Sequence, residues 1–135
     1  MLEFTSETNI HHVFLADDIG LASVFPKLKE RLAQPGYKHV TLVYYSSSDP
    51  QAFHPELGIL QNHFPTQLFV LYCYKDRPGF REFRNEDIEA ILNANTMQRM
   101  EFILSGMENF VARASGVLRL LGIQDWQMQE QYFTS

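Results

Sequence analysis

Short continuous runs of apolar and β-branched residues alternate along this chain with segments in which apolar residues return every three or four positions. The runs predict strands at about residues 10–15, 39–45, 68–74, 101–104 and 126–133. The periodic segments predict helices from Leu21 to Leu32, at about 55–62, after an Asn85 cap, and from Met107 to a stop at Gly122. Because the middle runs are too continuously apolar for strands with one wet face, we expect strands covered on both sides.

This alternation predicts an α/β protein with a single domain, residues 1–135. Right-handed crossovers between parallel strands place helices on both faces of a sheet, which predicts a doubly wound, three-layer α/β/α fold. Ligands of such sheets bind outside the carboxyl ends of the strands, where the strand order switches. We therefore expect residues 17–21, 46–49 and 105–108 to form one crevice.

The stretch from Phe14 to Ser23 stands at the centre of that crevice. Its apolar run breaks into Asp17 and Asp18 and then Gly20 before the helical pattern begins. Glycine permits a close or left-handed backbone, and Ser23 is a good helix N-cap, so the stretch is typical of a strand, a tight turn and a helix start. This unit binds phosphates in nucleotide folds. The alternative is an ordinary strand-to-helix loop with acidic caps.

Composition narrows the choice of partner and compartment. The formal charge of −5, without a stripe of Lys and Arg, argues against nucleic acid. No apolar stretch approaches the ~20 residues of a membrane helix, and the first residues do not resemble a signal peptide. The single cysteine, Cys73, lies in an apolar run, which favours a buried thiol and a cytoplasmic location. The five histidines lack metal-ligand spacing, so we predict no metal site.

Other chemistries have weaker support in the sequence. No G-x-S-x-G motif is present, and Ser105 has no histidine near it in sequence. Asp17 and Asp18 could act as a general acid–base pair, but adjacent carboxylates more often cap a helix. The predicted strands contain Tyr44, Tyr45, Tyr72 and Tyr74, and one of these tyrosines at a strand end is a candidate to stack on an adenine.

Several motifs together resemble one family. Residues 14–23 line up with a strand followed by G-G-x-G-x-x-P, and residues 43–46 with the strand before a ribose-phosphate loop. Residues 56–57 match an acidic-Leu pair, residues 105–110 match C-G-P-x-x-M, and residues 129–133 match an acidic-aromatic ending. In these motifs, over nearly all its length, the chain resembles the nicotinamide-dinucleotide-binding (C-terminal) domain of the ferredoxin–NADP reductase family. The turn is also similar to the G-D-E-T-like turn of the siderophore-interacting reductase branch.

This resemblance implies an NAD(P)-binding domain of a flavin-dependent oxidoreductase, which supplies the pyridine nucleotide for hydride transfer to a flavin held elsewhere. The implied cofactor-binding residues are Asp17, Asp18, Ile19, Gly20, Leu21, Ser46, Ser47, Gly106, Met107, Glu108 and Phe133. Ser105, in the position of the family's cysteine, is a weak catalytic candidate. The expected cofactor is NAD(P)H, and FAD or FMN is expected only with a flavin-binding partner domain in the same or another polypeptide. No basic residue occurs in residues 46–48, which disfavours NADP.

The turn itself departs from the family pattern. Asp17 and Asp18 replace the first two glycines, and Ser23 replaces the proline. A carboxylate about 5 Å from a phosphate oxygen costs roughly 3 kcal/mol at an effective dielectric of ~20. Two hypotheses follow: a domain that binds a pyridine dinucleotide, and a degenerate, non-catalytic relative that acts as a binding or assembly module. They differ in whether a carboxylate fills the phosphate position.

For the fold we predict the strand order 3-2-1-4-5, with Gly20 and Gly106 at strand-to-helix turns on one edge. An antiparallel pair among the first four strands would be incompatible with this prediction.

We also predict that the purified chain carries no flavin, because residues 1–9 are too few to form a flavin-binding barrel. A visible absorbance spectrum checks this, and a yellow preparation with flavin bands would contradict it.

Overall fold

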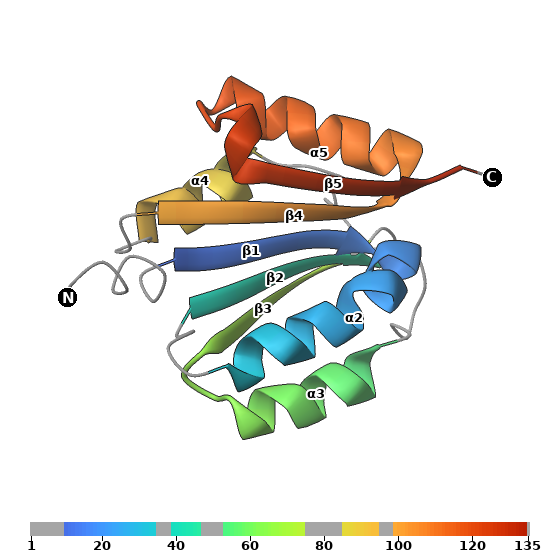
Figure 1. Cartoon of the computed structure of the whole chain (residues 1–135), viewed down its shortest axis with the longest axis vertical. Coiled ribbons are helices and arrows are strands. Elements are labelled where there is room, and N and C mark those ends of the chain that lie inside the picture. The colour runs from blue at the N-terminus through green and yellow to red at the C-terminus, as the bar shows by residue number, and fades with distance from the viewer. Residues whose placement is uncertain (1–9, 35–38, 47–52, 75–84, 95–98, 135) are drawn as a thin grey trace.

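The computed structural model describes residues 10–34, 39–46, 53–74, 85–94 and 99–134 (Figure 1). Five strands form one sheet in the order β3-β2-β1-β4-β5, and every pair of neighbours is parallel. The strands are β1 (Ile10–Asp17), β2 (His39–Ser46), β3 (Leu68–Tyr74), β4 (Arg99–Met107) and β5 (Met128–Phe133). The helices are α2 (Asp18–Ala33), α3 (His54–His63), α4 (Asn85–Ala94) and α5 (Glu108–Leu120), and the short η1 (Asp125–Gln127) leads into β5. The predicted fold class and strand order are confirmed.

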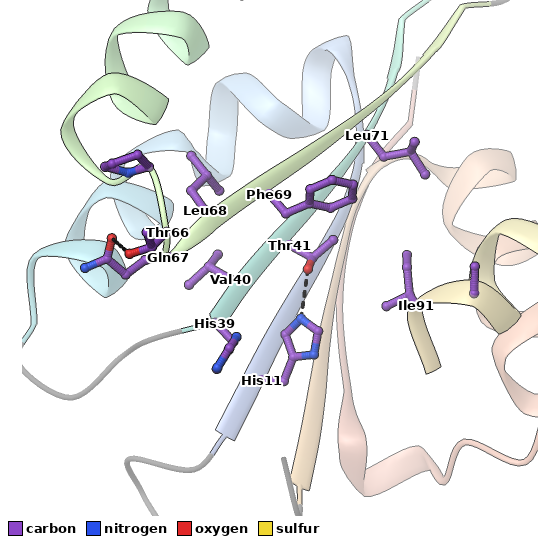
Figure 2. A pocket seen from close by; sticks show the side chains of 12 residues that line it. His11, His39, Val40, Thr41, Thr66, Gln67, Leu68, Phe69, Leu71 and Ile91 are labelled. Carbon is purple, nitrogen blue, oxygen red and sulfur yellow. Dashed lines mark hydrogen bonds between the residues drawn. The ribbon is translucent and has the colours of Figure 1, made fainter. Parts of the chain in front are cut away.

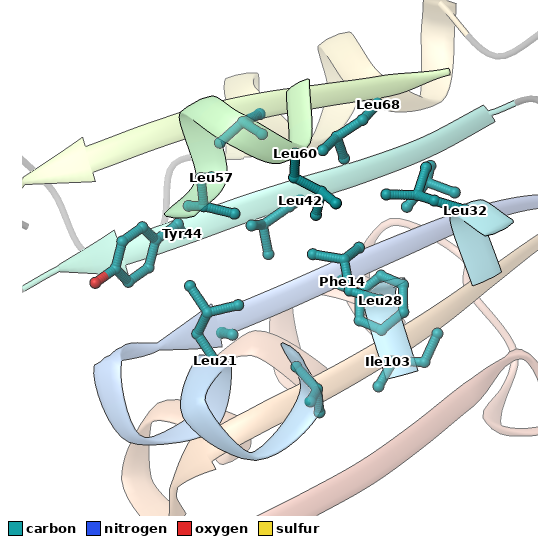
Figure 3. Close-up of a cluster of buried hydrophobic side chains, with 14 residues drawn as sticks. Phe14, Leu21, Leu28, Leu32, Leu42, Tyr44, Leu57, Leu60, Leu68 and Ile103 are labelled. Atoms are coloured by element: carbon teal, nitrogen blue, oxygen red, sulfur yellow. The ribbon is translucent and has the colours of Figure 1, made fainter. Parts of the chain in front are cut away.

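An apolar cluster on each face of the sheet holds the three layers together. The first joins the sheet to α2 and α3 and includes Phe14, Leu28, Leu42, Tyr44 and Leu57 (Figure 3). The second joins the sheet to α4 and α5 and includes Val13, Leu15, Ile88, Phe102 and Phe110. Successive residues of a strand therefore face opposite layers, which is why the strands read as continuous apolar runs.

The start of α2 differs from the prediction. The helix begins at Asp18, and its N-cap is Asp17, whose side chain accepts a hydrogen bond from the backbone of Gly20. Ser23, the predicted cap, lies inside the helix, so that prediction was wrong. Pro26 lies in the middle of α2. An aspartate cap satisfies the free N–H groups of a first turn as well as serine does, and here it stands earlier in the chain.

Two strand boundaries also differ. β4 continues past the predicted end at Leu104 to Met107. β5 starts at Met128 and not at Trp126, because residues 125–127 form a 3-10 turn closed by side chains at both of its ends. The predicted stop of α5 is confirmed: Gly122 has a φ of +96°, and its N–H reaches back to the carbonyl of Arg119.

Cys73, the single cysteine of the sequence, is half-buried at the margin of the second cluster. Within the residues given above, no helix combines the length and the apolar character needed to cross a membrane. The side chain of Asn85, the predicted cap, lies outside the described residues.

A buried histidine joins the amino ends of β1 and β4 to the last turns of α2. His12 is 1% exposed; its Nδ1 lies 2.9 Å from Nη1 of Arg31 and 4.0 Å from a carboxylate oxygen of Glu101. Arg99 pairs with the same carboxylate at 2.9 Å. Burial and then the charges of Arg31, His11 and Arg99 lower the pKa of His12 from its ordinary 6.5 to about 4.

We expect the protein to lose stability as the pH falls from about 6.5 to about 4. In this window the unfolded chain protonates His12 whereas the folded chain does not, so the contribution is complete above pH 6.5 and is lost on acidification. At 1.36 kcal/mol per pKa unit, this difference between the folded and the unfolded chain predicts a loss of roughly 3 kcal/mol. Denaturant unfolding as a function of pH should show a shallower acid decline for His12→Gln. The exposed His63 supplies the control, because His63→Gln should leave the decline unchanged; parallel profiles for all three proteins would refute this assignment.

Candidate functional site

The carboxyl edge of the sheet between β1 and β4 is the switch point of this fold. β1 and β4 are neighbours in the sheet, and the chain leaves β1 towards β2 on the opposite side from β4. Helices α2 and α5 follow these two strands directly and begin at the edge to which the arrowheads point (Figure 1). Two helix N-termini, each with a partial positive charge, thus stand side by side where such sheets bind ligands.

The carboxylate of Asp17 bridges these two helix starts. Its Oδ1 accepts a hydrogen bond of 2.8 Å from the N–H of Gly20, and its Oδ2 accepts one of 2.9 Å from the N–H of Met107. Gly20 belongs to the first turn of α2, and Met107 is the N-cap residue of α5, whose own side chain makes no capping bond. Asp17 therefore uses the kind of backbone donor that an anionic ligand uses at a helix N-terminus.

Two glycines provide the room for this bridge. A Cβ on Gly106 would lie 2.6 Å from Cγ of Asp17, and one on Gly20 would lie 1.8 Å from the carbonyl oxygen of Ser105. Ser105 is fully buried, and its hydroxyl donates a hydrogen bond of 3.1 Å to the carbonyl of Gly20. The first turn of α2 is thereby locked against the end of β4. The hydroxyl of Ser105, the weak catalytic candidate, is committed to this contact.

The carboxylate of Asp18 turns towards β2. There the phenol of Tyr44 donates a hydrogen bond to Oδ1 of Asp18. Tyr44 is fully buried and packs against Phe53 and Tyr72 at the start of α3 and in β3. Both acidic side chains of the turn are therefore engaged by the protein itself.

The remaining predicted site residues fall into three groups. Ile19 and Glu108 are exposed in the first turns of α2 and α5, whereas Leu21 is fully buried in the first apolar cluster. Met107 and Phe133 are half-buried cross-strand partners at the ends of β4 and β5. Ser46 ends β2, but its side chain and all of Ser47 lie outside the described residues. The structure thus brings Asp17, Gly20 and residues 105–107 together, with Phe133 beside them.

Two contacts of the site were not expected from the sequence. Tyr44, the partner of Asp18, could have been found from the sheet register, which pairs it with Ala16 just before the turn. The other contact joins α2 to β5, where the side-chain amide of Gln131 donates a hydrogen bond of 2.7 Å to the hydroxyl of Ser23. These residues are 108 positions apart, and no local pattern predicts their contact. Among the described residues, no group of three or more His, Cys, Asp or Glu is placed to hold a metal ion.

The fold of this chain is similar to that of several proteins of known structure. Neither the protein-family models nor the curated proteins include a match to this sequence. Among solved structures, the chain is similar to the CS-b5R domains of human Ncb5or in its NAD+ form, with a TM-score of 0.74, 13% identity, and coverage of 96% of this chain and 39% of that chain.

It is also similar to flavohemoglobin from Malassezia yamatoensis with bound FAD and heme, with a TM-score of 0.75, 19% identity, and coverage of 93% and 32%. A third match is ferredoxin-NADP+ reductase from Plasmodium falciparum with 2′P-AMP, with a TM-score of 0.68, 15% identity, and coverage of 98% and 56%. The chain spans less than two-thirds of the length of each protein. At these identities the likeness establishes the fold, and it confirms the predicted resemblance to the dinucleotide-binding domain of the ferredoxin–NADP reductase family.

The contact between Gly20 and β4 generates a stability prediction. Gly20→Ala should destabilise the protein by about 3 kcal/mol or more, because its Cβ would overlap the backbone of Ser105, which has no side-chain freedom to give way. The matched control is Gly116→Ala in α5, where nothing lies within 4 Å of an added Cβ; it should stabilise the helix by about 0.5–1 kcal/mol. Denaturant unfolding measures both changes, and similar stabilities for the two variants would show that α2 is not locked against β4.

Proposed function

We propose that this chain is a ferredoxin reductase-like nucleotide domain that works with a flavin-binding domain, and that its own Asp17 carboxylate closes the diphosphate position. The observation that carries the proposal is the pair of hydrogen bonds to Asp17 from Gly20 and Met107. In this role the chain acts as a binding or assembly module of a flavin-dependent oxidoreductase, and a pyridine dinucleotide binds to it weakly.

The energy of the contacts favours a diphosphate position that is filled by the carboxylate of Asp17 over one that is filled by a ligand. A dinucleotide that used these donors would first displace a carboxylate from two backbone N–H groups, and each hydrogen bond to a charged group contributes about 1.5–3 kcal/mol. The displaced carboxylate, still attached at the end of β1, would then repel a phosphate oxygen about 5 Å away by roughly 3 kcal/mol. Since 1.4 kcal/mol corresponds to a factor of ten, either effect alone lowers the affinity at least about tenfold.

The second candidate function is that of an NAD(P)-binding domain that presents the reduced nucleotide to the flavin of its partner. The retained close-approach positions support it: Gly20 and Gly106 keep the backbone of α2, β4 and α5 in the arrangement that a phosphate site of this fold needs. Similarity in fold to Ncb5or in its NAD+ form and to a flavohemoglobin with FAD also supports it. In this case Asp17 swings away when the nucleotide binds.

Replacing both carboxylates separates these candidates. We predict that Asp17→Gly with Asp18→Gly tightens NADH binding by at least about tenfold, roughly 1.4 kcal/mol, because it removes the repulsion and opens the donors of Gly20 and Met107. The unmodified chain should bind in the high micromolar range or more weakly. Calorimetry at matched salt measures both affinities.

Two further variants sharpen that experiment. Glu30→Gln with Glu89→Gln removes the same charge from exposed positions outside the turn and should leave the affinity near that of the unmodified chain. Asp17→Asn keeps the size of the side chain and removes its charge. The gain in NADH affinity of this variant therefore measures the electrostatic repulsion separately from the steric block. Equal affinities for the double glycine variant and the unmodified chain, or tight binding by the unmodified chain, would exclude a closed diphosphate position.

A further inference from the structure

A cavity lies at the opposite edge of the sheet from Asp17, at the amino ends of β1, β2 and β3 (Figure 2). Its volume is about 600 Å³. The floor is the face of the sheet that is turned towards α4, and Ile91 of that helix forms one wall. Strands of seven or eight residues at about 3.3 Å per residue separate this cavity from the turn at Asp17 by roughly 20–25 Å.

On the cavity floor polar side chains are buried and an aromatic ring is exposed, which is the reverse of the usual pattern on a covered sheet face. His11 and Thr41 are buried on this face, whereas Phe69 is 59% exposed. In the register of the sheet Thr41 pairs with Phe69, and His11 pairs with His39. Strands covered on both sides normally carry apolar residues inside and leave no aromatic ring exposed. Local departures from the packing rules that gather at one place are typical of functional sites.

The polar groups of the floor lie together at its amino end. Nε2 of His11 and the hydroxyl of Thr41 are 2.8 Å apart. The ring of His39 stands edge-on to that of His11, with 6.1 Å between the ring centroids. Phe69 and Leu71 of β3 follow along the same face, with Ile91 across from them (Figure 2). The cavity thus has one hydrogen-bonding end and one apolar end.

The charge of the lining limits the class of ligand. Among the described residues that line the cavity there is no Asp, Glu, Lys or Arg. A charged ligand would find no Lys, Arg or carboxylate partner there and would lose much of its hydration on entering. A flat apolar body can stack on Phe69, and the imidazole and hydroxyl side chains offer hydrogen bonds to its polar edge. The volume lies within the range of about 300–1,000 Å³ that is usual for small-molecule sites.

We propose that this cavity binds a small uncharged aromatic molecule with one hydrogen-bonding edge, of the size of an indole or a phenol. The aromatic ring lies against Phe69 and Leu71, and the polar edge meets His39 and the pair formed by His11 and Thr41. The site is separate from the turn at Asp17 and does not depend on the nucleotide chemistry proposed there.

Titration of the 15N-labelled full chain with indole, followed by NMR, tests this proposal. We expect saturable shifts of the amides of Thr41, Phe69 and Ile91, with a dissociation constant on the order of 1 mM, and no shift at Gly20. Phe69→Ala should weaken binding at least about fivefold and should fold normally, because the ring is mostly exposed. Indole-3-acetate, which carries a charge on the same ring, should bind at least about fivefold more weakly than indole.

Ile59→Ala provides the matched control, since Ile59 is an exposed apolar side chain on α3, on the other face of the sheet. It should leave the affinity for indole unchanged. Absence of binding to the full chain, shifts that do not saturate or that spread over exposed apolar residues in general, or an unchanged affinity in Phe69→Ala would each overturn the proposal.

Discussion

Two helix N-termini meet at one edge of this sheet, and the structure there depends on the negative charge placed between them. Adjacent parallel strands that each lead into a helix bring two positive helix ends close to each other. The first backbone N–H groups of these helices have no partner within their own helix. In this protein Asp17 supplies the charge and accepts from both helices. Position 106 requires glycine because a Cβ there would overlap the carboxylate of Asp17. The close approach of α2 to β4 buries Ser105, whose hydroxyl donates a hydrogen bond to the carbonyl of Gly20.

An internal carboxylate and a bound phosphate are alternative solutions to the same electrostatic problem. A glycine turn leaves the donors open for a ligand, and water satisfies them when the ligand is absent. An aspartate satisfies them permanently, which stabilises the empty domain and opposes the ligand. The bond from Tyr44 to Asp18 adds to this effect, because it ties the neighbouring carboxylate to the packed interior of β2. Under the function proposed above, stability of the turn and affinity for a diphosphate are therefore in conflict.

The sequence was sufficient for the fold because its signals are redundant. Continuous apolar strands, periodic helices and a C-terminal glycine at Gly122 all favour the same doubly wound sheet. It was insufficient for the start of α2, because Asp17 and Ser23 are both good caps and only the tertiary contact with Met107 decides between them. The direction in which a carboxylate points is likewise a property of the folded turn. The exposed Phe69 beside the buried Thr41 becomes visible only once the strands are in register.

Strand β1 connects the two edges of the sheet through its alternation. Phe14 and Ala16 face α2, whereas Val13 and Leu15 face α4 and α5, and all four are completely buried. The same alternation turns His12 towards Arg31 of α2 and leaves His11 on the cavity side. A slip of one residue would exchange the two histidines and would withdraw the carboxylate of Asp17 from both helix starts. The apolar residues at the middle of β1 therefore determine the geometry at both ends of the strand, although they take part in neither site.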